Sequence, residues 1–239
     1  MDNLPIVILH GWNLSASKFE PLVKLLKEKK FAVYCPDLPG FGHKRQINKV
    51  LRLEDYSNFL NQYLSGNNLA KIILICHSFG GRVGLKFLSK NEHSVKKVIF
   101  TGVPGFTPVK RIKVIFYAYL AKLGRLFFSL PLVNRFSGYA RKVIYKMAGA
   151  MDYYHTDESM RETFENVVTE GLVDYMKAIN IPALLIWGEK DAVVPPEVAQ
   201  KMNRVIKNSR LQIINGVGHG LPYTHPHKFF LAVRQFLKQ

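Results

Sequence analysis

A serine surrounded by small and aromatic residues follows an apolar run directly, in the stretch His-Ser-Phe-Gly-Gly at positions 77–81. The run before it, 72–76, has the β-branched residues of a buried strand, and residues 80–90 fit a helix. A serine on such a tight strand-to-helix turn is held above the strand end, because the glycines let strand and helix approach closely. Ser78 is therefore predicted to be a nucleophile.

A serine hydroxyl needs a base and an oriented partner for that base. His219, in the stretch Gly-Val-Gly-His-Gly at 216–220, is the predicted base, because a neutral imidazole titrates in the useful pH range. A carboxylate beyond the imidazole would fix its tautomer and stabilise the imidazolium. Asp191 opens a loop directly after a predicted strand and is the predicted acid, and Glu189 is its rival.

Six short runs bounded by Gly, Pro or Asp predict the strands that position these residues. They are 6–9, 31–35, 72–76, 98–100, 183–187 and 211–214. Five of them are continuously apolar, as expected for strands buried on both faces of a parallel sheet. Helical patterns lie between them, at about 17–29, 54–65, 80–90, 196–207 and 226–238. This alternation predicts the α/β class, with a parallel sheet covered on both sides.

Five motifs in this order resemble those of the α/β-hydrolase fold serine hydrolases, over nearly the whole chain. They are His-Gly-Trp at 10–12, Asp-Leu-Pro-Gly-Phe-Gly at 37–42, the serine turn at 77–81, the acid turn at 188–195 and the histidine loop at 216–220. The resemblance implies a mostly parallel sheet of about six strands, because the chain begins at what would be the family's third strand. The first two motifs are similar to those of carboxylesterases that demethylate the pimeloyl carrier-protein ester.

The resemblance also implies roles for residues around the nucleophile. The backbone N–H groups of Trp12 and Phe79 would form the oxyanion hole. The substrate pocket would be lined by His10, Gly11, Phe41, His77 and Phe116. We expect His10 to hydrogen-bond within its own loop, and His77 to act as scaffolding beside the nucleophile rather than as a second base.

A long insertion interrupts the alternation of strand and helix. From Pro104 to about Ile179 no run predicts a strand, and the length exceeds that of a simple loop. The predicted organisation is a core domain of residues 1–103 and 180–239, with a helical lid (cap) at 104–179.

The predicted lid combines apolar and cationic residues. Between His93 and Met151 there is no Asp or Glu, and the lid contains the cationic residues Lys110, Arg111, Lys113, Lys122, Arg125, Arg135, Arg141, Lys142 and Lys146. Apolar residues between them, Phe116 included, would give a helix an apolar stripe beside a cationic one. The stripe is predicted to roof the pocket over Ser78. Alternatively, part of it meets an anionic membrane surface or an acidic carrier protein.

Composition and charge narrow the remaining functional classes and the expected location of the protein. The chain has 34 Lys and Arg against 17 Asp and Glu, a net charge of +17, yet it has no nucleic-acid reading motif, so nucleic-acid binding is not expected. No apolar run approaches the roughly 18 residues of a membrane span, and the N-terminus lacks the pattern of a signal peptide, so the protein is expected to be cytoplasmic. The scattered histidines predict no metal site.

The two cysteines, Cys35 and Cys76, lie in strand-like runs and are predicted to be free thiols. Cys76 stands where the family's Gly-x-Ser-x-Gly pattern has its first glycine, so its side chain must fit beneath the helix that follows.

The predicted activity is cofactor-free hydrolysis of carboxylic esters with small, hydrophobic acyl groups, through an acyl-enzyme on Ser78. The alternatives within the same fold are a lactonase, a thioesterase or a carbon–carbon bond hydrolase, because a fold does not dictate its substrate. An alternative of another class is a ligand-binding receptor with an intact triad.

Overall fold

The computed structural model describes residues 4–44, 49–106 and 156–238. The chain divides into two compact units, one of residues 1–106 and 171–239 and the other of residues 107–170. The second unit falls inside the range 104–179 predicted for the insertion. Most of it lies outside the described residues, and with it lie Phe116 and the cationic residues of the predicted lid helix.

A six-stranded sheet forms the centre of the first unit, in the order β2-β1-β3-β4-β5-β6. Its strands are β1 (Ile6–Leu9), β2 (Val33–Tyr34), β3 (Ile72–His77), β4 (Val95–Thr101), β5 (Ala183–Gly188) and β6 (Ser209–Ile214). Every neighbouring pair is parallel. Strands β1, β3 and β5 are buried at every residue, as their apolar sequences require. The predicted α/β-hydrolase fold with six parallel strands is therefore confirmed.

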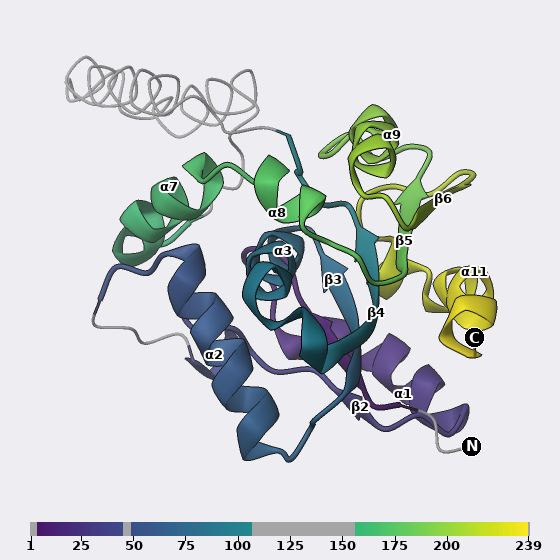
Figure 1. Cartoon of the computed structure of the whole chain (residues 1–239), viewed down its shortest axis with the longest axis horizontal. Helices are drawn as coiled ribbons and strands as arrows, with labels where there is room; N and C mark the ends of the chain where they lie inside the picture. The colour runs from purple at the N-terminus through teal and green to yellow at the C-terminus, as the bar shows by residue number, and fades with distance from the viewer. Residues whose placement is uncertain (1–3, 45–48, 107–155, 239) are drawn as a thin grey trace, which may run out of the picture. The chain divides into compact units, whose positions relative to one another are not determined.

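Helices cover both faces of this sheet (Figure 1). The helices of the first unit are α1 (Glu20–Glu28), α2 (Leu53–Gly66), α3 (Phe79–Asn91), α8 (Val173–Lys177), α9 (Pro196–Val205), α10 (Leu221–Thr224) and α11 (Pro226–Lys238). Short 3-10 turns occupy Ala16–Phe19, Gly42–Lys44 and Glu92–Ser94. In the second unit the described residues form a 3-10 turn, Glu158–Met160, and α7 (Arg161–Thr169).

Residue alternation along each strand assigns the two faces. Ile6 and Ile8 of β1 pack in one core cluster with Leu22 of α1 and Phe229 of α11, so these two helices cover one face. On the other face α3 packs against α2 and α8, and α9 packs on β5 and β6 (Figure 1). The edge strand β2 is shorter than the predicted run 31–35.

The shortness of β2 has a local cause at each end. Lys30, just before the run, has a left-handed φ of 67°, so the chain turns there instead of extending. Pro36, just after the run, has no N–H with which to continue a ladder. The pairing with β1 therefore covers only Val33 and Tyr34.

The connection from β3 to α3 accommodates the cysteine at the first glycine position of the serine turn. Cys76 is fully buried, and a Cβ placed on Gly84, one and a half turns into α3, would collide with its Sγ. A Cβ on Gly80 would likewise collide with the backbone oxygen of Leu9. The helix approaches the sheet this closely because it has glycine at both positions. Gly84 therefore provides the space that Cys76 occupies.

Candidate active site

Ser78 lies between the end of β3 and the start of α3, as its neighbours predict. Its backbone has φ 51° and ψ −113°, a conformation that a residue with a side chain adopts only where the surroundings impose it. The Ser78 N–H donates to the carbonyl oxygen of Thr101, at the end of the adjacent β4, over 3.0 Å. Ser78 is partly exposed, whereas its neighbours His77 and Phe79 are buried. The turn therefore presents this one residue outward.

Asp191 and His219, from two separate loops, form a close pair. The distance from His219 Nδ1 to Asp191 Oδ2 is 2.8 Å. The other carboxylate oxygen, Oδ1, accepts the backbone N–H groups of Val193 at 3.0 Å and Val194 at 2.8 Å. The Asp191 side chain is 1% exposed and the His219 side chain 18%. A carboxylate with both oxygens hydrogen-bonded can be buried, and it holds the imidazole in one orientation.

This pairing also defines the tautomer of the imidazole. A carboxylate only accepts hydrogen bonds, so Nδ1 of His219 carries the proton and donates it to Asp191. Nε2 then has the lone pair that a general base uses. The geometry of the pair is that of a base and its orienting acid.

Glu189, the rival acid, has a different partner. Its Oε2 accepts the N–H of Gly216 over 2.9 Å, and its side chain is exposed. Gly216 has φ 71°, a left-handed conformation that glycine adopts without strain. Glu189 therefore stabilises the turn that leads into the histidine loop, and Asp191 is the carboxylate that binds His219.

Gly102, directly after β4, packs against the same pair and was not among the predicted site residues. Its φ is +62°, and a Cβ there would lie 2.7 Å from Cε1 and 2.8 Å from Nδ1 of His219. The same atom would lie 3.5 Å from Asp191 Oδ2. A glycine at the carboxyl end of a predicted strand, at the edge where the chemistry is expected, was the available signal.

The loop after β1 lies against the nucleophile. A Cβ on Gly11 would lie 3.3 Å from Ser78 Cβ. His10 is fully buried and bridges two loops: its Nδ1–H donates to the Gly11 carbonyl oxygen over 2.8 Å, and its Nε2 accepts the Leu38 N–H over 2.9 Å. Burial lowers the pKa of His10, so the ring is neutral, as this hydrogen bonding requires. His10 holds its loop, as predicted, and has no exposed surface with which to line a pocket.

Four aromatic rings pack together beside the serine turn. The centroid of the Trp12 ring lies 4.8 Å from that of Phe41 and 5.0 Å from that of Phe79. The centroid of the Tyr56 ring, from α2, lies 5.0 Å from that of Phe79. All three pairs have edge-to-face geometry. Each of the four residues is less than a tenth exposed. Trp12 and Phe79 are thus brought to one side of Ser78, and Phe41 is a buried part of the same wall.

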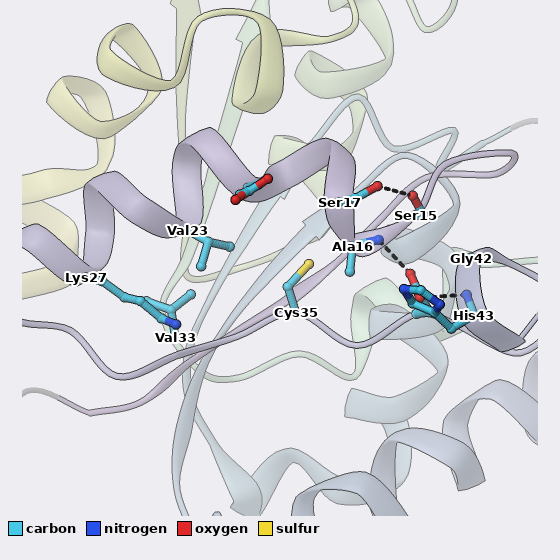
Figure 2. A pocket seen from close by; sticks show the side chains of 11 residues that line it. Ser15, Ala16, Ser17, Val23, Lys27, Val33, Cys35, Gly42 and His43 are labelled. Carbon is cyan, nitrogen blue, oxygen red and sulfur yellow. Dashed lines mark hydrogen bonds between the residues drawn. The ribbon is translucent and has the colours of Figure 1, made fainter.

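A groove of about 650 Å³ lies elsewhere, between α1 and the edge strand β2 (Figure 2). At one end Asp37 accepts the backbone N–H groups of Ala16 at 2.7 Å and His43 at 2.9 Å. Burial raises the pKa of this carboxyl, but the two hydrogen bonds together with the nearby His10 and His43 outweigh burial, and the net shift is downward. Burial, together with Asp37, raises the pKa of the Cys35 thiol to about 12, so this cysteine stays protonated. Asp37 anchors two loops here, and none of the predicted catalytic residues lines the groove.

Two other kinds of feature are absent from the residues that the structure describes. Residues 4–44, 49–106 and 156–238 contain no group of three or more His, Cys, Asp or Glu side chains that could hold a metal ion. Within the same ranges no helix combines the length and the apolar character that crossing a membrane requires. Cys35 and Cys76 are both free.

Comparison with known proteins identifies the family to which this fold belongs. The sequence profile described as "alpha/beta hydrolase fold" matches residues 5–226. The chain belongs to the α/β-hydrolase fold family.

The names of individual relatives indicate several different activities. A putative esterase/lipase of Mycoplasma pneumoniae is 25% identical, over 97% of this chain and 88% of its own length. The solved structure of a thermophilic esterase from Thermogutta terrifontis has a TM-score of 0.76 at 23% identity, covering 98% of this chain and 89% of that one. A bromoperoxidase from Bacillus anthracis has a TM-score of 0.73 at 26% identity, covering 99% and 92%. Hydrolase chemistry is therefore supported, and the substrate is a separate question.

Proposed function

We propose that the protein hydrolyses carboxylic esters of small, hydrophobic acyl groups, with Ser78 as nucleophile, His219 as general base and Asp191 as the orienting acid. One observation carries this proposal: the 2.8 Å hydrogen bond between His219 Nδ1 and a buried Asp191, at the sheet edge where a serine is held on a strained turn. Esterase-named relatives support the ester as substrate.

The reaction proceeds in two steps. His219 Nε2 takes the proton of the Ser78 hydroxyl as its oxygen attacks the ester carbonyl, and the protonated imidazole then gives that proton to the leaving alcohol. In the second step the same nitrogen deprotonates a water molecule, which attacks the acyl-enzyme. The bond between the acyl carbon and the Ser78 oxygen breaks, the imidazolium returns its proton to that oxygen, and the acid is released. Asp191 keeps Nδ1 protonated throughout and stabilises the imidazolium that forms in each step.

The proposed oxyanion hole consists of the backbone N–H groups of Trp12 and Phe79. Phe79 is the first residue of α3, where the helix itself supplies no acceptor for the N–H and the helix dipole favours a negative charge. Trp12 follows Gly11, which approaches Ser78 closely enough that a Cβ would lie 3.3 Å from Ser78 Cβ. Two such donors supply the preorganised stabilisation that a tetrahedral intermediate needs.

The aromatic wall favours small acyl groups. Trp12, Phe41 and Phe79 fill the space on one side of the serine turn with rings that are at most 7% exposed. A long acyl chain on that side would have to displace them, and core side chains resist displacement because they are closely packed.

Labelling and turnover together test the proposal. The wild-type protein should react with a fluorophosphonate probe and should hydrolyse p-nitrophenyl acetate and butyrate faster than the dodecanoate. Ser78→Ala should lose both properties. Labelling without turnover of any p-nitrophenyl ester or lactone would indicate the receptor alternative. Because a structural neighbour is named a bromoperoxidase, bromination of a reporter dye serves as the control for that activity.

Carbon–carbon bond hydrolysis, lactone hydrolysis and thioester hydrolysis use the same three residues, so substrate preference separates them. A panel of matched oxygen esters, thioesters, lactones and vinylogous diketones should show the highest kcat/KM for the oxygen esters. A higher kcat/KM for a diketone by tenfold or more would replace the ester proposal with the carbon–carbon one.

We also propose that the lid contacts an anionic surface, membrane or acidic carrier protein, through cationic residues that lie outside the described ranges. This proposal rests on the sequence pattern alone. Binding to anionic vesicles should weaken as salt rises from low to high concentration, because screening weakens the electrostatic attraction. It should disappear when Lys110, Arg111 and Lys113 are changed to Glu. Failure to bind vesicles or carrier protein at low salt would remove this role.

A further inference from the structure

His77, directly before the nucleophile, contacts the histidine that is proposed to act as base. Its ring centroid lies 4.9 Å from that of His219, with the ring planes inclined by 50°. Its other ring neighbours are Tyr223 at 5.4 Å and Phe19 at 5.8 Å. A Cβ on Gly11 would lie 3.2 Å from His77 Cδ2. One side chain therefore touches the histidine loop, the helix after it and the loop beside the nucleophile.

The polar atoms of this ring are unsatisfied. His77 is fully buried, and neither Nδ1 nor Nε2 has a hydrogen-bond partner. The backbone of Thr101 approaches the ring closely enough to raise the pKa of His77, but the contact does not reach the distance and angle of a well-formed hydrogen bond. Leaving a buried polar group unpaired is costly, so a phenylalanine would fit this environment at lower cost. The shape and volume of the ring, rather than its nitrogens, therefore determine its contacts here.

His77 is neutral in the folded protein. Burial lowers the pKa of His77 well below its usual value, and the neighbouring His219 and His10 act in the same direction. The rings of Tyr223 and Phe19 also lie against it. A neutral ring can lie against His219 when that imidazole takes up a proton, whereas a cation there would repel it.

We propose that His77 is a positioning residue. Together with Gly102 it forms the contact surface that holds the His219 ring in the orientation needed between Asp191 and Ser78. Gly102 allows close approach from β4, since a Cβ there would lie 2.7 Å from His219 Cε1. His77 fills the space beside the same ring from β3. Asp191 binds only Nδ1, and a single hydrogen bond leaves the ring free to swing about it. Contacts with His77 and Gly102 restrict that swing, and hence the direction in which Nε2 points.

The inference rests on the proposed function of His219, and a truncation series tests it. His77→Ala removes the contact, and His77→Phe keeps a ring of similar size without the nitrogens. Phe229→Ala is the matched control, because Phe229 is equally buried but lies in the core between α11 and the sheet. The measurements are kcat and KM for p-nitrophenyl acetate per folded molecule, the melting temperature, and the low-field proton NMR signal of the His219 Nδ1–H. Asp191→Asn assigns that signal by removing it.

His77→Ala should lower kcat about a hundredfold with little change in KM, because a small misplacement of a catalytic group is enough for such a loss. The Nδ1–H signal should broaden or vanish. His77→Phe should recover kcat to within about tenfold of wild type and keep the signal. Phe229→Ala should lower the melting temperature while kcat per folded molecule and the signal persist.

Two results would overturn the inference. One is a His77→Ala protein that keeps the Nδ1–H signal and loses kcat only in proportion to its unfolded fraction, which would make His77 an ordinary core residue. The other is a His77→Phe protein as damaged as His77→Ala. A wild-type protein without esterase activity or fluorophosphonate labelling would refute the proposed function instead. The NMR comparison would still show whether His77 holds the His219 ring in position.

Discussion

At the scale of single residues, the structure distinguishes two carboxylates that the sequence places two positions apart. Asp191 is buried and binds His219, whereas Glu189 is exposed and accepts the Gly216 N–H. Sequence order identified Asp191 as the better candidate. The direction in which each side chain points depends on the turn after β5, and a sequence pattern carries no such information.

Asp191→Asn should lower kcat about ten-thousandfold, because an amide at this position stabilises the wrong tautomer of His219. Glu189→Gln should lower it by less than about tenfold, since an amide oxygen still accepts the Gly216 N–H. The pair is compared by steady-state hydrolysis of p-nitrophenyl acetate. A larger loss in Glu189→Gln than in Asp191→Asn would show that the acid is assigned wrongly.

At the scale of elements, the packing of α3 on β3 explains how a cysteine replaces the first glycine of the serine turn. The compensating residue, Gly84, lies eight positions later, on the helix face that meets Cys76 Sγ. The motif shows that the side chain of Cys76 needs space beneath the helix, but only the orientation of α3 over β3 shows that Gly84 provides this space.

Gly84→Ala should therefore destabilise the protein by about 1–3 kcal/mol, the usual cost of overpacking a core. Cys76→Ala removes Sγ and should leave space for the added methyl group, so the double variant Cys76→Ala/Gly84→Ala should be more stable than the sum of the two single effects. Gly66→Ala, at a position with nothing within 4 Å of the added atom, is the control. Urea unfolding measures all four. Additive effects would contradict the proposed contact.

Most of the strands and helices could be predicted from the sequence. Six strands and five of the helices follow from apolar runs and periodicity, because most of these elements bury an apolar face. Strand β6 is the exception, since it has no fully buried residue. Two details depended on tertiary contacts instead: the short helix α10 after His219, and the close approach of Gly102 to His219. Such features arise from the way neighbouring loops pack, and the local sequence does not specify that packing.

At the scale of the whole molecule, two neutral buried histidines make stability depend on pH. Burial lowers the pKa of His10 and, further, that of His77. In the unfolded chain each titrates near its ordinary value of about 6.5. Below about pH 6.5 the unfolded chain binds more protons than the folded protein. The contribution of the neutral histidines to the free energy of unfolding is therefore fully present above that pH and is lost as the pH falls.

Between pH 7 and 5 the free energy of unfolding should therefore decrease, with each histidine contributing a slope of up to about 1.4 kcal/mol per pH unit. His77→Phe should remove one of the two contributions and flatten the curve, because phenylalanine binds no proton in either state. Urea unfolding at several pH values measures this. An equally steep acid limb in the variant would mean that the pKa of His77 is not lowered on folding.

The central claim is that Ser78 carries the acyl group during turnover, and intact-protein mass spectrometry during the burst phase tests it most directly. Wild-type protein mixed with p-nitrophenyl acetate should release about one equivalent of nitrophenol rapidly and show one acetyl group, located by peptide mapping on Ser78. Ser78→Ala should show no acetylated species and a kcat lower by about a millionfold. Turnover in Ser78→Ala within tenfold of wild type, or an acetyl group on another residue during wild-type turnover, would contradict the account.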